Sequence, residues 1–127
     1  MLDKYPVHAT IPCSDFDRAK AWYKEKLGLE PYDEDEGGAY YRCGNGSEFG
    51  LFPTPYAGTA KNTQMEWSVD DIAATVKELQ GNGVTFDHFD MPGIQWDGDI
   101  AVMGPFKGAW MKDSEGNTLG LTERVSS

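Results

Sequence analysis

Apolar and polar residues alternate near the start of the chain and then change to a helical spacing. The alternation begins at His8 and stops at Ser14-Asp15, which predicts a strand. Ser14 or Asp15 suits the N-cap of a helix, and Gly28 suits the position after its last turn. The pattern therefore predicts a strand that leads directly into a helix over residues 16–27. The apolar positions of this helix are Phe16, Ala19, Tyr23 and Leu27.

The same order of patterns returns in the second half of the chain. An alternating stretch over residues 64–69 predicts another strand, and a Gly-Asn-Gly triplet ends the helix pattern that follows it. His8 stands seven positions before Asp15, as Gln64 stands seven positions before Asp71. The two strand–helix units therefore align without a gap, which indicates an internal repeat. The apolar face of the second helix is marked by Ile72, Thr75, Val76 and Leu79.

The closing strand of each half also repeats, because the sequence around Gly50 resembles the sequence around Gly120. The prolines and glycine of residues 53–58 suit a linker between the halves. We therefore predict an α+β fold of two βαβββ modules, over residues 1–55 and 56–127, in one compact domain. The two strand-like stretches that precede each closing strand cover about 29–33, 39–43, 84–90 and 107–112.

Strand alternation gives the predicted strands two faces. One face is apolar, with Val7, Ile11 and Cys13 in the first strand and Met65 and Trp67 in its counterpart, and we expect it to pack under the helices. The other face is polar in all four strands, which favours one shared cleft. The cleft-facing positions are His8, Thr10, Glu48, Gly50, Phe52, Gln64, Glu66, Ser68, Thr118, Gly120 and Thr122.

Aromatic residues make up 13% of the chain, more than two thin layers usually need. Flat side chains beside glycines form a slot that suits a planar, amphipathic ligand. The segment 91–105 is bounded by Pro-Gly and Gly-Pro pairs and predicts a lid or an edge of this cleft, and His88 is expected at the surface. The predicted ligand-binding residues are His8, Thr10, Tyr41, Glu48, Phe52, Gln64, Glu66, Trp96, Phe106 and Trp110.

The net charge of −10 limits the partners, because only 11 Lys and Arg residues are available to contact phosphates. We therefore expect no nucleic-acid partner. No apolar run approaches the roughly 20 residues that span a bilayer, and the first residues do not resemble a signal peptide, so we expect no membrane contact and a cytoplasmic location. The acidic run 33–36 predicts a solvated turn between strands rather than a cation site.

The two cysteines, Cys13 and Cys43, lie far apart in the sequence. Neither has the Cys-x-x-Cys context of a redox site, nor a neighbouring Cys or His at metal-ligand spacing. A disulfide between them is possible by number alone. Because the expected compartment is reducing, two free thiols are the prediction.

Residues 8–29 and the turn over residues 113–117 together resemble the vicinal oxygen chelate superfamily, which includes glyoxalase I, extradiol dioxygenases and bleomycin-binding proteins. The carrying features are the Ser-Asp-Phe-Asp-Arg-Ala helix start at Ser14, the Trp22-Tyr23 pair and the Leu-Gly-Leu helix end. The resemblance implies a curved mixed sheet of two βαβββ modules around a small-molecule cleft. It also implies a homodimer, with modules that pair within a chain or between chains. These motifs identify the superfamily but no activity within it.

In metal-dependent members of this superfamily four cleft positions hold a divalent cation, and here they read His8, Gly50, Gln64 and Gly120. Only His8 is a strong ligand, whereas a catalytic cation usually has at least three protein donors. Glu48 and Glu66 lie two residues from these positions, about 6–7 Å further along their strands. We therefore predict that the metal has been lost and that no cofactor is bound.

Three functions compete at this point. The first is a metal-free protein that binds or sequesters an aromatic or antibiotic-like molecule. The second is an enzyme, either a metal-dependent lyase or dioxygenase or one that uses His8 and Glu66 for proton transfer. The third is a partner of another protein that responds to a small molecule. Metal content distinguishes the first two.

Overall fold

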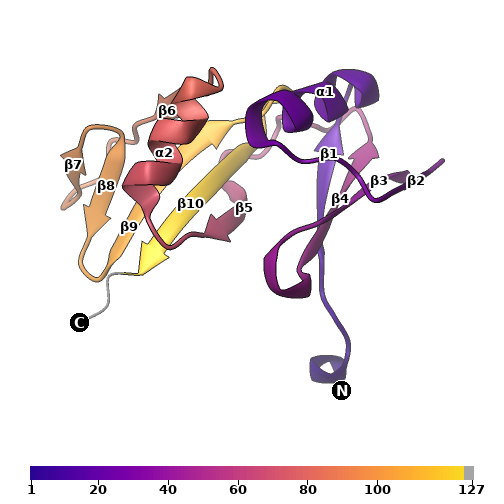
Figure 1. Ribbon diagram of the computed structural model, residues 1–127, viewed down its shortest axis with the longest axis horizontal. Coiled ribbons are helices and arrows are strands. Elements are labelled where there is room, and N and C mark those ends of the chain that lie inside the picture. Colours follow the sequence, from indigo (N-terminus) through magenta and orange to yellow (C-terminus); the bar gives the residue numbers. More distant parts are fainter. Residues whose placement is uncertain (125–127) are drawn as a thin grey trace.

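The computed structural model describes residues 1–124 and has two mixed sheets, each with one long helix (Figure 1). The first sheet has the strand order β1-β4-β3-β2, and α1 links β1 to β2. Strands β1 and β4 run parallel and the other neighbours run antiparallel. We call these elements the N-terminal module. Their bounds are β1 Ala9–Cys13, α1 Phe16–Leu27, β2 Asp33–Asp35, β3 Gly38–Arg42 and β4 Glu48–Pro53, with short 3₁₀ helices η1 Leu2–Lys4 and η2 Gly44–Gly46.

The second sheet, that of the C-terminal module, repeats this arrangement with one added hairpin. Its order is β5-β10-β9-β8-β7, with β6 also paired to β9. The first and last strands, β5 and β10, again run parallel. The bounds are β5 Thr63–Ser68, α2 Ile72–Gly81, β6 Phe86–Asp87, β7 Gln95–Asp97, β8 Ile100–Met103, β9 Phe106–Lys112 and β10 Thr118–Arg124. The predicted α+β class and the repeated βαβββ order are confirmed.

The two helices start in the same way. Asp15 accepts a hydrogen bond from the backbone N–H of Arg18, and Asp71 accepts one from the N–H of Ala74. Each aspartate satisfies a donor that the first turn leaves without a partner, which stabilises a helix end. Gly28 ends α1 with φ of 69°, a left-handed conformation that glycine adopts without strain.

Several strand boundaries differ from the prediction. The second strand begins only at Asp33, so three residues of the acidic run lie in β2 rather than in a turn. The stretch predicted over residues 84–90 forms a strand only at Phe86–Asp87. Strand β1 starts at Ala9, and Val7 is 92% exposed instead of packing under the helix.

The 91–105 segment forms the β7–β8 hairpin, which extends the second sheet beside β9. Main-chain hydrogen bonds therefore fix most of this segment as the edge of the sheet. Whether this segment acts as a lid or as an edge of the cleft stays a prediction. The structure also leaves Cys13 and Cys43 as free thiols, as expected.

One apolar core runs through both modules. Tyr41 and Phe49 stack with ring centroids 4.7 Å apart, and the Phe49 ring meets the edge of Trp67 at 6.1 Å. Because Phe49 lies on β4 and Trp67 on β5, this contact joins the two modules. Figure 1 shows the modules in separate halves of the molecule, with the N-terminal arm extending away from both sheets.

The β9–β10 turn fastens the C-terminal module to the start of α1. The buried carboxylate of Glu115 accepts hydrogen bonds from the backbone N–H groups of Ser14 and Asp15, at 2.9 and 2.8 Å, and from Arg18 Nε at 2.8 Å. Asn117 Nδ2 donates to the carbonyl of Pro12 at 2.8 Å. This turn, which is part of the family resemblance, therefore holds the two modules together by hydrogen bonds.

Candidate functional site

The polar face of the N-terminal module is hollowed around Gly50, which pairs with Thr10 on β1 and with Tyr40 on β3. A Cβ atom on Gly50 would lie 3.4 Å from Cδ1 of Tyr40. A Cβ at position 50 would therefore be in van der Waals contact with the Tyr40 ring. The hollow has a volume of about 350 Å³ and is lined by His8, Thr10, Gly37, Tyr40, Gly50, Leu51 and Phe52.

The C-terminal module has a matching hollow of about 320 Å³, lined by Thr63, Gln64, Met65 and Glu66. Glu66 pairs with Gly120, and a Cβ on this glycine would lie 3.3 Å from the Oε2 atom of Glu66. A side chain at position 120 would therefore require the Glu66 side chain to shift slightly. Within residues 1–124, the buried Oε1 atom of Gln64 has no hydrogen-bond partner, although buried polar atoms normally have one.

An aromatic wall adjoins this second hollow. Trp110 meets Phe89 and Trp96 edge to face, with centroids 5.3 and 6.2 Å apart. Trp96 stacks on His88 at 4.1 Å, and His88 Nε2 lies 2.7 Å from Oδ1 of Asp99. The neighbouring space of about 390 Å³ is lined by Lys61, Asn62, Thr63, Phe89, Asp90, Met91 and Trp110. Since Thr63 lines both spaces, the polar hollow adjoins the space that Phe89 and Trp110 line.

The structure brings most of the predicted residues into two groups. His8, Thr10 and Phe52 line the hollow of the N-terminal module, whereas Gln64 and Glu66 line that of the C-terminal module. His8 and Glu66, the candidate acid–base pair, therefore line different hollows. Trp96 and Trp110 form the aromatic wall, and Phe106 lies four residues before Trp110 on the same side of β9. Glu48 instead pairs with Arg42 Nε, at 3.1 Å.

Tyr41 was predicted to bind the ligand, but it lies in the core. Its side chain has no exposed surface, and it stacks on Phe49 while also meeting Tyr23. Burial raises its pKa to about 12. Because side chains alternate along β3, the adjacent Tyr40 lies on the polar face instead. Its pairing with Gly50, a predicted cleft position, identifies Tyr40 as a residue of that face. Phe89, which contacts Trp110 in the C-terminal module, is a second residue of the candidate site that was not predicted from the sequence.

The chain belongs to the Glyoxalase/Bleomycin resistance protein/Dioxygenase superfamily, whose family model matches residues 6–121. Three solved structures illustrate the shared fold. A glyoxalase family protein from Enterococcus faecalis has a TM-score of 0.72 and 20% identity, with 97% of this chain and 100% of that chain covered. A bleomycin-binding protein complexed with bleomycin has a TM-score of 0.71 and 21% identity, with 94% and 98% covered. TnmS3, an antibiotic binding protein from Streptomyces sp. CB03234, has a TM-score of 0.64 and 22% identity, with 94% and 95% covered.

A search among curated proteins gives no match. These three structures are below 25% identity to this chain, so they establish the fold alone. In the part of the chain that the structure describes, no helix is long and apolar enough to cross a membrane.

The donor set of this chain does not fit the divalent cation of the metal-dependent family members. Two of the four expected positions are Gly50 and Gly120, which offer no side-chain ligand atom. The other two, His8 and Gln64, line separate hollows. Across residues 1–124 no group of three or more His, Cys, Asp and Glu side chains is placed to hold a metal ion.

Proposed function

We propose that this protein binds and sequesters a planar, amphipathic small molecule, of aromatic or antibiotic-like character, without a catalytic metal. One observation carries the proposal: the aromatic wall of Trp96 and Trp110 adjoins a polar hollow whose buried acceptor, Gln64 Oε1, has no partner among residues 1–124. Flat rings supply contact area at little entropic cost, and a few polar atoms orient the ligand. The antibiotic-binding neighbours of the same fold support this choice.

We also propose that two copies of the chain pair to complete the cleft. His8 and Gln64 line different hollows, so a second copy could bring the polar face of one module to that of the other. The N-terminal arm supports the proposal, because four of its apolar side chains are exposed. Their exposed fractions are 95% for Met1, 80% for Leu2, 68% for Tyr5 and 92% for Val7. Such a concentration of apolar surface is typical of an interface.

Three further assignments belong to the proposal. The net charge of −10 supports a protein that binds neither nucleic acid nor an anionic membrane surface. The free thiols of Cys13 and Cys43 support a cytoplasmic location, where thiols stay reduced. The two modules, residues 1–55 and 56–127, are proposed to form one cooperative domain, supported by the bonds that Glu115 makes to the start of α1.

Fluorescence titration with bleomycin and a panel of flat heterocycles tests the binding function. We expect saturable quenching that is lost when Trp96 and Trp110 are both replaced by alanine. Replacement of Trp22, which lies on α1 outside the candidate cleft, by phenylalanine serves as the control and should leave the titration unchanged. Quenching that survives the double alanine variant would contradict the assignment of the aromatic wall.

A further inference from the structure

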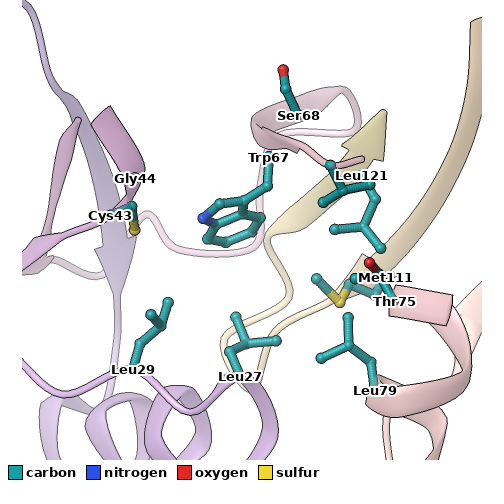
Figure 2. Close-up of a pocket in the computed structure, with 11 residues that line it drawn as sticks. Leu27, Leu29, Cys43, Gly44, Trp67, Ser68, Thr75, Leu79, Met111 and Leu121 are labelled. Carbon is teal, nitrogen blue, oxygen red and sulfur yellow. The ribbon is translucent and has the colours of Figure 1, made fainter. Parts of the chain in front are cut away.

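A cavity of about 330 Å³ lies between the two modules and is lined by residues of both (Figure 2). It opens on the core side of the second sheet, because the paired residues Trp67 and Leu121 both line it, whereas Glu66 lines the hollow of the cleft face. Figure 2 shows side chains of both modules directed toward one space. The lining residues are Leu27, Leu29, Cys43, Gly44, Trp67, Ser68, Val69, Thr75, Leu79, Met111 and Leu121.

The chemistry of this lining selects for an uncharged, apolar occupant. Seven of the eleven lining residues have large apolar side chains and none of the eleven is charged. The hydroxyl of Thr75 already donates to the carbonyl of Asp71, at 2.8 Å. A charged ligand would lose its hydration without a compensating partner, whereas an apolar ligand gains from leaving water.

The volume and shape of the cavity also limit the size of the ligand. Small-molecule sites begin at a volume of about 300 Å³, and apolar cavities of about half that volume bind benzene. The walls come from the end of α1, the α2 helix and the strands β5, β9 and β10, and the space between them is open to solvent on one side. This shape suits a compact molecule of one or two fused rings better than an extended peptide.

We propose that this inter-module cavity is a second ligand site, separate from the cleft, which takes an uncharged aromatic molecule of one or two rings. A ligand held there contacts Leu27 and Leu29 of the N-terminal module together with Trp67 and Leu79 of the C-terminal module. Because it binds the assembled modules and not the unfolded chain, it stabilises the native state. The proposal does not depend on the function of the cleft.

Cys43 provides a reporter for occupancy, because its half-buried thiol lines the cavity. Cys13 provides the internal control: it is fully buried, and burial together with the charges of Glu115 and Asp113 raises its pKa to about 11. A thiol reagent therefore modifies Cys43, while Cys13 stays unreactive in the folded protein.

The test uses naphthalene as the ligand and N-ethylmaleimide as the thiol reagent on the full chain. We expect saturating naphthalene to slow modification of Cys43 at least threefold and to raise the midpoint of thermal unfolding. Leu79→Phe, which fills the cavity from α2, should lose both effects, and Trp110→Ala in the cleft should keep both. Thr75→Leu is a second filling variant in case Leu79→Phe is poorly folded.

Four results would overturn the inference. Failure of naphthalene to protect Cys43 in the parent protein excludes the ligand site, as does protection that persists in both filling variants. Loss of protection in Trp110→Ala would place naphthalene in the cleft. If the filling variants changed the molecular mass measured by light scattering, the cavity would instead be a contact between copies of the chain.

Discussion

The hydroxyl of Tyr23 donates a hydrogen bond of 2.8 Å to Oδ2 of Asp113, with both residues buried. Tyr23 belongs to α1 of the N-terminal module, and Asp113 belongs to the turn between β9 and β10 of the C-terminal module. Burial is the main cause that raises the pKa of Tyr23, and the charge of Asp113 and this hydrogen bond raise it further. The phenol therefore stays protonated and acts as a donor between the modules.

Tyr23→Phe should lower the free energy of unfolding by about 1–3 kcal/mol, because Asp113 loses one donor to a buried carboxylate. Urea unfolding followed by Trp fluorescence and by circular dichroism measures the change. Tyr40→Phe is the matched control, since the Tyr40 hydroxyl bonds to Asp35 at the surface and its removal should cost less than about 0.5 kcal/mol. The two probes should also report one transition. Two separate transitions would contradict the proposal of a single cooperative domain.

The contact that Glu115 makes between the two modules should be sensitive to acid. Burial alone raises the pKa of its carboxyl, but hydrogen bonds from Arg18, Asp15, Ser114 and Ser14 outweigh burial and hold the pKa at about 2, below the ordinary value of 4.5. Because the folded-state pKa is lowered, the stabilisation is fully present above pH of about 4.5 and is lost as the pH falls toward 2. The lost stability should be of order 3 kcal/mol.

Urea unfolding at a series of pH values from 2 to 7 compares the parent with Glu115→Gln, which should be less stable at neutral pH and show a flatter acid dependence. Glu30→Gln controls for the loss of one negative charge, because Glu30 pairs with Lys24 at the surface. Parallel curves for the parent and Glu115→Gln would show that the Glu115 contact does not govern acid stability.

The purified protein should contain no stoichiometric transition metal. The physical reason is that Gly50 and Gly120 offer no ligand atoms at two of the four positions that the family uses. Elemental analysis after purification without chelators makes the measurement. Nickel, zinc, iron or manganese at close to one ion per chain would reverse the assignment of a metal-free cleft.

Light scattering should give the mass of a homodimer at micromolar concentration. Removal of residues 1–7 should shift the dimer toward monomer, because this arm carries the exposed side chains of Met1, Leu2, Tyr5 and Val7. Circular dichroism of the shortened chain checks that the modules remain folded. A monomer in the parent protein across the micromolar range would remove the pairing proposal.

The sequence by itself determined the elements and their repeated order. Helix starts at Asp15 and Asp71, the left-handed end at Gly28 and the alternating first and last strands all depend on neighbours within a few residues. Capping, backbone conformation and strand alternation are local, so they can be inferred without knowledge of the fold. The same local information placed His8, Gln64 and Glu66 on the polar face.

Tertiary structure decided which of two adjacent tyrosines lies on the polar face. Tyr40 and Tyr41 are adjacent, and the choice between them depends on the register of β3 against β4, in which Tyr40 lies opposite Gly50. A shift of one residue would exchange the two side chains between the core and the hollow. Local composition does not distinguish the two registers, because both place a tyrosine in the core.

Tertiary structure also decided how the modules meet. Glu115 contacts Ser14 about one hundred positions away in the sequence, and Tyr23 contacts Asp113 at a similar separation. The inter-module cavity combines the end of α1 with α2 and three strands of the second sheet. Contacts of such long range depend on the packing of whole elements against one another, which periodicity and spacing along the chain do not encode.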